Sequence, residues 1–275
     1  MPELPEVEGY RQYLEATSLH QPIDDLDVED TKLLTTDPML LLEALRGASF
    51  TGTRRVGKNL FVYTDRPGVI VRMHFGMTGD LAYYHQSLDR PRHARIVFRF
   101  RGGYHLGFIC PRKFERIGIV HDIETFLREK KIGKDALELT AADLEIVLAS
   151  RKTPIKSALL DQQVAAGVGN WIADELLFHA RIHPLKPAHQ LTTAEIEALQ
   201  VAIQEVLLTA IAKEARYADF PASYLIHARA WDTSPYEDTQ QHLNCPRCGT
   251  LINNIRVGGR ATYFCPNCQR LGPND

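Results

Sequence analysis

The sequence predicts an α+β protein in which a helix and an antiparallel β-sandwich are followed by a helical domain and a small cysteine-bearing module. Strand-like alternation dominates residues 21–120, helical periodicity takes over from residue 123, and two Cys-x-x-Cys pairs stand near the C-terminus. A chain of 275 residues is also long for a single core. We therefore expect three parts, at residues 1–122, 123–240 and 241–275.

The first part is expected to begin with a helix and to continue as strands. Residues 7–19 carry apolar residues at mixed helical spacing and contain no proline, which predicts one helix. Short apolar runs bounded by turn residues predict the strands that follow, and such strands favour an antiparallel sandwich or barrel. They are expected over residues 60–64, 69–74 and 95–101.

The clearest strand signal predicts a β-hairpin. Residues 95–101 place three apolar side chains on one face: Ile96, Phe98 and Phe100. Gly102 and Gly103 follow, and paired glycines supply the positive φ angles that a two-residue turn requires. Residues 104–109 are then the returning strand.

The second part carries two sequence signals for helix starts. Thr140 precedes Asp143, and Thr192 precedes Glu195, at the spacing of a capping box. The second signal opens a helix with one apolar stripe, formed by Ile196, Leu199, Ile203, Val206, Leu207 and Ala210. The pattern fades over residues 215–244, which contain two prolines and are interpreted as a linker or a functional loop.

The composition is that of a soluble globular protein, with 44% apolar and 24% charged residues. No apolar run approaches the roughly eighteen residues that cross a bilayer, so a membrane role is not expected. The start of the chain, residues 1–6, is acidic and contains two prolines, which differs from the basic and apolar start of a signal peptide. We therefore expect the protein in the cytoplasm.

The net charge of −2 is unusual for a protein that binds a phosphate backbone, because such binding depends on lysine and arginine. The charges are nevertheless unevenly distributed. Acidic residues concentrate at 24–30, whereas basic residues concentrate at 54–58, 112–113, 151–156 and near the C-terminus. Each cluster taken alone is also compatible with a solvated surface.

Four cysteines predict a structural zinc site. Cys245 and Cys248 form one pair, Cys265 and Cys268 form another, and sixteen residues separate the two pairs. Two such thiolate pairs complete a tetrahedron around one Zn²⁺ and leave no open position for catalysis. The alternative is a pair of disulfides, which the expected cytoplasmic location disfavours. Cys110, the fifth cysteine, is interpreted as a small buried residue.

Several segments, in this order, resemble one enzyme family. They are Pro-Glu-Leu-Pro-Glu-Val-Glu at 2–8, the segment 156–162 beginning Lys-Ser-Ala-Leu-Leu, the segment 167–175 beginning Gly-Val-Gly-Asn, Ile-His-Pro at 182–184, and the cysteines with Gly259 and Arg260. Together they resemble the N-terminal signature, the helix–two-turn–helix and the zinc finger of the formamidopyrimidine-DNA glycosylase and endonuclease VIII family. The resemblance extends along nearly the whole chain.

The resemblance implies a monomeric base excision repair enzyme that acts on damaged double-stranded DNA. In this family Pro2 forms a Schiff base with the sugar, an oxidised base is released, and the strand is cleaved by β/δ-elimination. An α-amine suits this chemistry, because its pKa of about 8 leaves more of it neutral than the pKa of about 10.4 of lysine. The mechanism requires removal of Met1. Without this context, Pro2 is simply a rigid start of the chain.

The resemblance assigns three more catalytic residues. Glu3 shuttles protons during base release and elimination. Glu6 corresponds to a second carboxylate of the site, although it could equally be a favourable charge at a helix N-terminus. Lys58 corresponds to a β-hairpin lysine that contacts phosphate and assists departure of the base, and alone it would be read as a surface lysine.

An enzyme that acts on a base rotates it out of the helix, and side chains fill the gap. The resemblance assigns Met77 to this gap, His74 to a phosphate, Arg112 to the orphaned base and Phe114 to a wedge beside it. Met77 and Phe114 could instead be core residues.

Three residues of the second and third parts complete the implied DNA-binding set. Lys156 belongs to the helix–two-turn–helix motif. Asn170 follows glycines at an expected helix start, where backbone N–H groups favour phosphate, although it could be only a helix cap. Arg260 lies on the zinc-finger arm and is expected to contact phosphate.

The chain departs from the family pattern where lesion choice is decided. Cys110 and Lys113 replace an acid and an arginine, and residues 215–244 lack the family's glycine-rich segment. Leu4 favours the purine branch, because the endonuclease VIII branch tends to have glycine there. The alternatives are an enzyme for oxidised pyrimidines or abasic sites, and a non-catalytic zinc-finger relative that binds DNA.

Overall fold

The computed structural model describes residues 1–229 and 243–272 of the chain. The chain divides into two compact units, Met1–Ile132 and Gly133–Asp275. Each unit combines helices with antiparallel strands, so the α+β class predicted from the sequence is confirmed.

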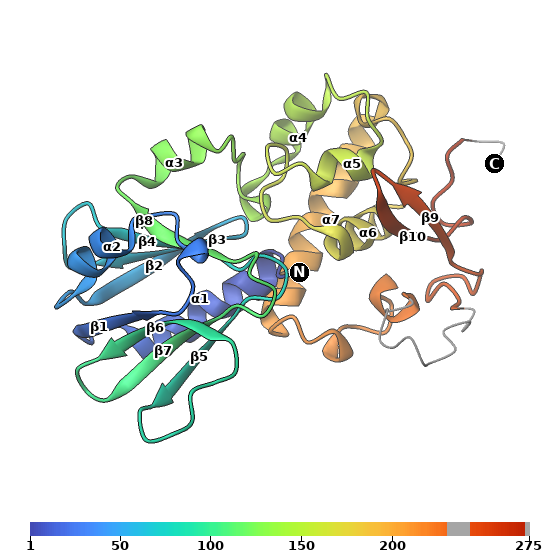
Figure 1. The fold of residues 1–275 in the computed structure, drawn as a ribbon. Coiled ribbons are helices and arrows are strands. Elements are labelled where there is room, and N and C mark those ends of the chain that lie inside the picture. The colour runs from blue at the N-terminus through green and yellow to red at the C-terminus, as the bar shows by residue number, and fades with distance from the viewer. Residues whose placement is uncertain (230–242, 273–275) are drawn as a thin grey trace. The chain divides into compact units, whose positions relative to one another are not determined.

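The first unit is built on two four-stranded antiparallel sheets (Figure 1). One sheet has the strand order β1 (Ile23–Val28), β6 (Ala94–Phe100), β7 (Tyr104–Ile109) and β5 (Asp80–His85). The other has the order β2 (Phe50–Val56), β3 (Asn59–Thr64), β4 (Ile70–His74) and β8 (Arg116–Val120). Buried side chains from both sheets, among them Phe50, Phe98 and Phe108, form one apolar core, as in a β-sandwich.

The N-terminal helix α1 (Leu4–Ser18) packs against β2, β3 and β5. It begins three residues earlier than the sequence pattern suggests. The reason is local, because a proline occupies the first turn and Glu3 and Glu6 form a capping box in front of it.

A second helix in this unit, α2 (Pro38–Leu45), was not expected between the strands. The carboxylate of Asp37 accepts hydrogen bonds from the backbone N–H groups of Met39 (2.9 Å) and Leu40 (3.3 Å). Asp before Pro is a helix-start signal, so the sequence did contain the information for this helix. The unit also holds a short 3₁₀ helix at Thr31–Leu33 and ends with α3 (Ile123–Glu129).

The predicted hairpin is formed by β6 and β7, and Ile96, Phe98 and Phe100 are all buried. Its turn differs from the prediction. The loop contains three residues, and only Gly103, with a φ of +79°, has the left-handed conformation. Its N–H donates to the carbonyl of Phe100 (3.0 Å), so one glycine suffices where two were expected.

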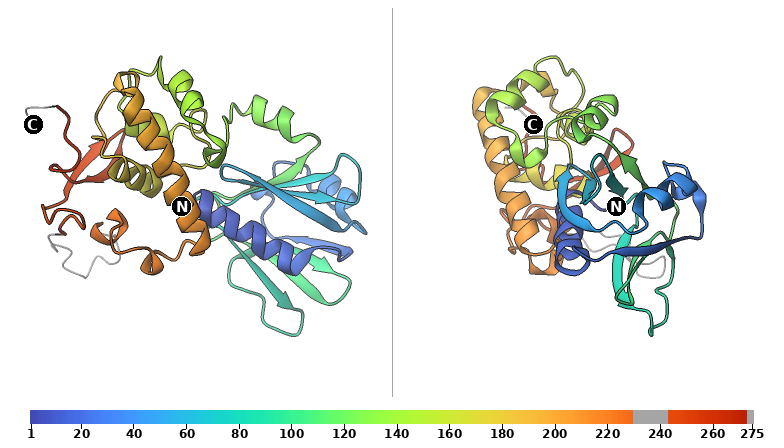
Figure 2. Two further views of the ribbon diagram at one scale, coloured as in Figure 1. Left: turned by 180° about the vertical axis from the view of Figure 1, so that it is seen from behind. Right: turned by 90° about the vertical axis from the view of Figure 1, so that its left-hand side faces the viewer.

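The second unit is largely helical. Its helices are α4 (Ala141–Leu148), α5 (Ile155–Leu160), α6 (Asn170–His179) and α7 (Thr193–Ala212), with 3₁₀ turns at Ala136–Glu138 and Ala188–Gln190. Both predicted capping boxes are present, and every residue of the predicted apolar stripe on α7 is buried. α4 and α6 pack against α7, the long orange helix in Figure 2.

The segment after α7 is packed and does not behave as a linker in its described part. Two 3₁₀ turns, Tyr217–Asp219 and Leu225–Ala228, follow α7. The buried carboxylate of Glu175 accepts the backbone N–H groups of Leu225 (2.7 Å) and Ile226 (2.9 Å), which fixes this segment to α6. The rest of the predicted loop, residues 230–242, lies outside the described residues.

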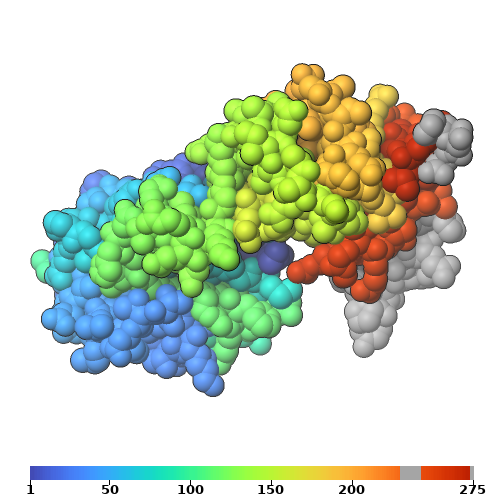
Figure 3. Space-filling view, turned by 90° about the horizontal axis from the view of Figure 1, so that it is seen from above, coloured from blue at the N-terminus to red at the C-terminus, as the bar shows by residue number. Residues whose placement is uncertain are grey.

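Near the C-terminus, the described chain forms a hairpin of β9 (Asn253–Val257) and β10 (Arg260–Phe264), which belongs to the red surface in Figure 3. Arg256 and Arg260 are both exposed on it. Within residues 1–229 and 243–272, the helices are too short or too polar to cross a membrane.

Candidate functional site

The N-terminus of α1 presents the residues predicted to do the chemistry. Pro2 is partly exposed and directly precedes Glu3, whose side chain is buried. The carboxylate of Glu6 accepts the backbone N–H of Glu3 at 3.0 Å. Glu6 is therefore a charge at the N-terminus of α1, which was the alternative to a catalytic role. Its carboxylate holds the backbone next to Pro2 in place.

A buried arginine joins α1 to the turn that carries Lys58. Arg55 contacts Glu8 of α1 (Nε to Oε2, 3.0 Å) and donates to the carbonyl of Gly57 (3.1 Å). Gly57 has a φ of +59°, and Lys58, the second residue of this β2–β3 turn, is partly buried. The turn is consequently fixed relative to the start of α1.

The strand register brings His74 to the same end of the sheet. Asn59 pairs with His74, and His74 pairs with Arg116. Burial, together with the smaller effect of the nearby charges of Arg72, Lys58 and Arg116, lowers the pKa of His74 to about 4. The ring is therefore neutral at pH 7. Its Nδ1 accepts the N–H of Gly76 (3.2 Å), which leaves the proton on Nε2 as a donor.

Two loops beyond this edge pack directly on each other. A Cβ on Gly76 would lie 2.7 Å from the backbone of Phe114, and a Cβ on Gly79 would lie 2.8 Å from the side chain of Glu115. Only glycine allows this approach. The loop of residues 75–79, which carries Met77, is thus in contact with the loop of residues 110–115.

The predicted gap-filling side chains are exposed on these loops. Met77 is 36% exposed and Phe114 is 52% exposed, so the alternative that they are core residues is wrong. The guanidinium of Arg112 lies 5.3 Å from the centre of the Phe114 ring. Tyr10 of α1 donates to the carbonyl of Gly79 at 3.0 Å, which joins α1 to the Met77 loop.

In the second unit, Asn170 lies at the start of α6, next to the zinc-finger hairpin. The helix cap is Gly169, so the alternative that Asn170 is only a cap is wrong. Its Nδ2 donates to the carbonyl of Ala261 (3.1 Å), directly after Arg260. Its Oδ1 is buried and has no hydrogen-bond partner within the described part of the chain. A buried acceptor of this kind requires a ligand or water.

Lys156 does not have the exposure that a direct DNA contact needs, which corrects the prediction. Its side chain is fully buried and forms an ion pair with Asp174 (2.7 Å). Its Nζ also donates to Ala261 O and Thr262 Oγ1, both at 2.8 Å. A lysine with these partners is part of the interior and holds β10 against α5 and α6.

Sequence reasoning missed the acidic partner of this lysine. Asp174 is 1% exposed and also contacts Arg229 (3.4 Å), a buried residue near the end of the described segment. A signal was present, since Asp174 and Glu175 stand together in an otherwise apolar helix. Charges in such a stretch need buried partners, but the sequence does not identify them.

The four cysteines converge as predicted, and Cys110 is fully buried elsewhere. All four Sγ atoms lie within 4.8 Å of one another, with separations of 3.4 Å for Cys248 and Cys265 and 3.9 Å for Cys245 and Cys268. Zn–S bonds of about 2.3 Å in a tetrahedron place sulfurs about 3.8 Å apart, whereas a disulfide needs about 2 Å. The cluster therefore fits one structural Zn²⁺.

Comparison with known proteins agrees with this arrangement. Three family models match successive segments: the formamidopyrimidine-DNA glycosylase N-terminal domain at residues 1–117, the H2TH domain of the same enzymes at 132–220, and a zinc finger found in FPG and IleRS at 244–271. The formamidopyrimidine-DNA glycosylase of Streptococcus pneumoniae is 34% identical, with 98% of this chain and 99% of the relative aligned. That of Symbiobacterium thermophilum is 36% identical over 98% of this chain and 89% of the relative.

Solved structures give the same result. A Lactococcus lactis formamidopyrimidine-DNA glycosylase bound non-covalently to DNA containing an AP site has a TM-score of 0.86 and 28% identity, covering 98% of this chain and 99% of that one. Another from the same organism, in complex with DNA containing FAPY-dG, has a TM-score of 0.83 and 28% identity, covering 98% of this chain and 100% of that one. The β-sandwich, H2TH region and zinc finger define a DNA repair glycosylase. The chain belongs to the formamidopyrimidine-DNA glycosylase family.

Proposed function

We propose that this enzyme removes oxidised purines, of the formamidopyrimidine and 8-oxoguanine type, from duplex DNA and then cleaves the strand by β/δ-elimination. The observation that carries the proposal is the position of Pro2, partly exposed beside buried Glu3 at the start of a firmly anchored helix. Relatives in complex with DNA containing FAPY-dG or an AP site support this substrate class.

The reaction begins when Met1 is removed and the neutral ring nitrogen of Pro2 attacks C1′ of the damaged nucleotide. The base leaves with its bonding electrons, and the C1′–O4′ bond then breaks, with O4′ keeping the electron pair and taking a proton. The positive iminium that this ring opening leaves on C1′ acts as the electron sink for elimination. Glu3 moves protons to and from the reacting groups, and Glu6 holds the Glu3 backbone. Lys58 supplies positive charge near the departing base, and the neutral Nε2–H of His74 donates to a phosphate oxygen.

The loops at the same end of the sandwich handle the duplex. Met77 fills the gap left by the extruded nucleotide, Phe114 wedges beside it, and Arg112 faces the orphaned base. Their exposure and the contact between their loops support these roles. The Met77 loop is joined to α1 by the hydrogen bond from Tyr10, and the Arg112 loop is joined to α1 through its contact with the Met77 loop.

In the second unit, Asn170 and Arg260 bind the phosphate backbone. The position of Asn170 at the N-terminus of α6, where backbone N–H groups favour phosphate, and the exposed guanidinium of Arg260 support this assignment. Lys156 acts indirectly, since its Nζ donates to the Ala261 carbonyl, which also accepts a hydrogen bond from Asn170.

We also propose three functional parts: the β-sandwich, the helical H2TH region and the zinc finger. The enzyme acts as a monomer on damaged double-stranded DNA, in the cytoplasm and on the nucleoid. These assignments follow from the family relationship.

Borohydride trapping tests the chemical proposal. Pro2→Gly is expected to reduce the covalent DNA adduct at least about tenfold while DNA affinity stays within about threefold. A mobile primary amine replaces the rigidly held secondary amine, which forms a charged iminium directly, and the phosphate contacts remain. Pro67→Gly, at an exposed turn of the same unit, is the matched control and should trap normally.

The same assay separates the alternatives. Undiminished trapping by Pro2→Gly, in protein shown by mass spectrometry to lack Met1, would reject the role of Pro2. A wild-type enzyme that binds DNA without any adduct would be a non-catalytic relative. A panel of lesions decides between oxidised purines and the oxidised pyrimidines or abasic sites of an endonuclease VIII-like enzyme.

A further inference from the structure

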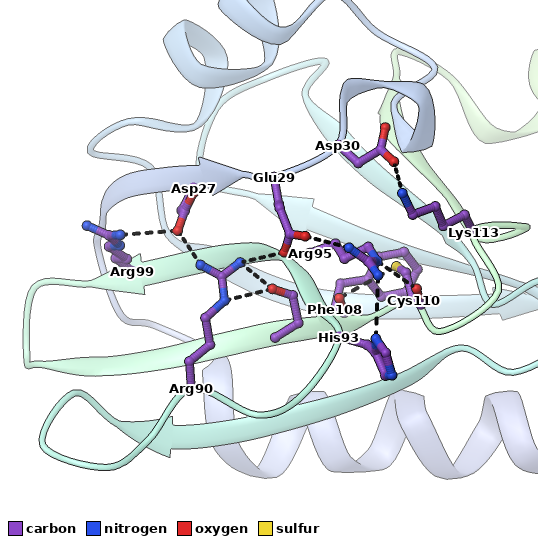
Figure 4. A network of polar contacts seen from close by, with 11 residues as sticks. Asp27, Glu29, Asp30, Arg90, His93, Arg95, Arg99, Phe108, Cys110 and Lys113 are labelled. Atoms are coloured by element: carbon purple, nitrogen blue, oxygen red, sulfur yellow. Dashed lines mark hydrogen bonds and ion pairs between the residues drawn. The ribbon is translucent and has the colours of Figure 1, made fainter.

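The loop that carries Arg112 and Phe114 is attached to the acidic residues that directly follow strand β1. Asp30 Oδ2 contacts Lys113 Nζ at 2.8 Å, and the guanidinium of Arg95 donates to the carbonyl of Cys110 at 3.0 Å (Figure 4). Arg95 is itself paired with Glu29. Two acids therefore hold the loop, one directly and one through an arginine.

These contacts account for the acidic cluster at residues 24–30, which is unexpected in a DNA-binding protein. Asp27 is paired with Arg90 and Arg99, just as Glu29 is paired with Arg95. Figure 4 shows three acids of this cluster, Asp27, Glu29 and Asp30, each facing a basic side chain. The cluster therefore serves internal pairing, and its charge is largely compensated within the first unit.

Lys113 is the residue on which the loop's geometry depends. Its φ is +59°, in the left-handed region that side-chain-bearing residues rarely adopt. It stands between Arg112 and Phe114, whose side chains contact each other while the lysine reaches Asp30. An ion pair that holds Lys113 in this conformation also fixes the directions in which the side chains of Arg112 and Phe114 point.

We propose that Asp30 and Lys113 are positioning residues for recognition of the base opposite the lesion, because their ion pair fixes the loop that presents Arg112 and Phe114. The proposal rests on the roles proposed above for those two side chains. A guanidinium distinguishes the acceptor atoms of different bases only when its direction is fixed. A mobile loop should therefore reduce the preference for one opposite base before it reduces the activity itself.

The environment of the pair makes it sensitive to salt. The Asp30 side chain is 16% exposed and the Lys113 side chain is 50% exposed. The hydrogen bond from Lys113, followed by that from the backbone N–H of Lys32, lowers the pKa of Asp30, so the carboxylate is charged at neutral pH. Partly exposed pairs weaken as ionic strength rises.

The test measures kcat/KM on lesion duplexes that differ only in the opposite base. Asp30→Asn keeps an acceptor for the Lys32 N–H and removes the charge, and Lys113→Met removes its partner. Each variant is expected to reduce, about fivefold, the ratio of kcat/KM between the best and the worst opposite base. Borohydride trapping on abasic-site DNA should be unchanged. The double variant should be no worse than either single variant, since both act through one contact.

Two further comparisons make the result decisive. Asp25→Asn removes an ion pair with Arg46 (3.1 Å) in the same acidic cluster, away from the loop, and should leave the ratio of kcat/KM values unchanged. In the wild type, raising the salt concentration should narrow the ratio, whereas Asp30→Asn should be insensitive.

The outcomes distinguish the positioning role of Asp30 and Lys113 from the role proposed for Arg112. If Arg112→Ala leaves the opposite-base ratio unchanged, the role of Arg112 is wrong. If Arg112→Ala narrows the ratio but Asp30→Asn and Lys113→Met do not, or if their effects add in the double variant, the positioning role of the ion pair is overturned.

Discussion

Replacing Lys156 by methionine should destabilise the second unit strongly, because it leaves a carboxylate buried without its main partner. Lys156 and Asp174 are 0% and 1% exposed and lie 2.7 Å apart. Removing one partner of such a pair typically costs 3–5 kcal/mol. Arg229, 3.4 Å from the other oxygen of Asp174, remains, so we expect about 3 kcal/mol, the lower end of the range reported for such pairs.

The effect on thermal unfolding depends on how much of the chain unfolds together. With about 2.1 cal/mol/K of unfolding entropy per residue, a loss of this size lowers Tm by about 10 °C for the second unit alone and about 5 °C for the whole chain. Lys186→Met is the matched control. Its pair with Glu195 (2.6 Å) is partly exposed, at 21% and 27%, and should contribute no more than about 1 kcal/mol.

The charge on Asp174 gives the experiment a second readout. Burial raises the pKa of Asp174, and Lys156 opposes this, so the variant should bind a proton more readily when folded. The loss of stability in Lys156→Met relative to the wild type should therefore grow as pH rises from 5 to 8. Adding Asp174→Asn to this variant should recover part of the loss. Urea unfolding that costs no more for Lys156→Met than for Lys186→Met would refute the reasoning.

Three other predictions concern separate parts of the molecule. Removing zinc with a chelator, or replacing Cys248 by serine, should unfold the β9–β10 hairpin and weaken DNA binding, measured by metal content and a binding titration; full affinity without metal would contradict it. Gly76→Ala should cost about 2–4 kcal/mol in urea unfolding because of its φ of +56° and its contact with Phe114, whereas Gly102→Ala, in open space, should be nearly neutral. The lowered pKa of His74 means that only the unfolded chain binds a proton between pH 6.5 and about 4, so stability falls as pH drops through this range; His74→Asn should flatten that slope, and an unchanged slope would exclude the effect.

Local signals in the sequence predicted much of the fold. The capping boxes at Thr140 and Thr192, the apolar stripe of α7 and the cysteine spacing each depend on neighbours a few residues apart, and all are present. The start of α2 at Asp37 and Pro38 was equally local and was overlooked.

The features that escaped prediction depend on distant pairs. Lys156 looks like a surface cation until Asp174 and Thr262 are known to surround it. The partner of Lys113 is separated from it by more than eighty residues, in an acidic segment that disfavours strands by composition. Register and burial determine such contacts, and neither can be read from spacing along the chain.

The hydrogen bond between Tyr10 and Gly79 has a consequence for the order of events during repair. It joins the helix that begins beside Pro2 to the loop that bears Met77, so a displacement of the loop acts directly on the helix. In the mechanism proposed above, entry of Met77 into the duplex would therefore bring the ring nitrogen of Pro2 towards the sugar in the same movement. A nucleotide that stays stacked would not reach this amine, so intact DNA would be protected from attack.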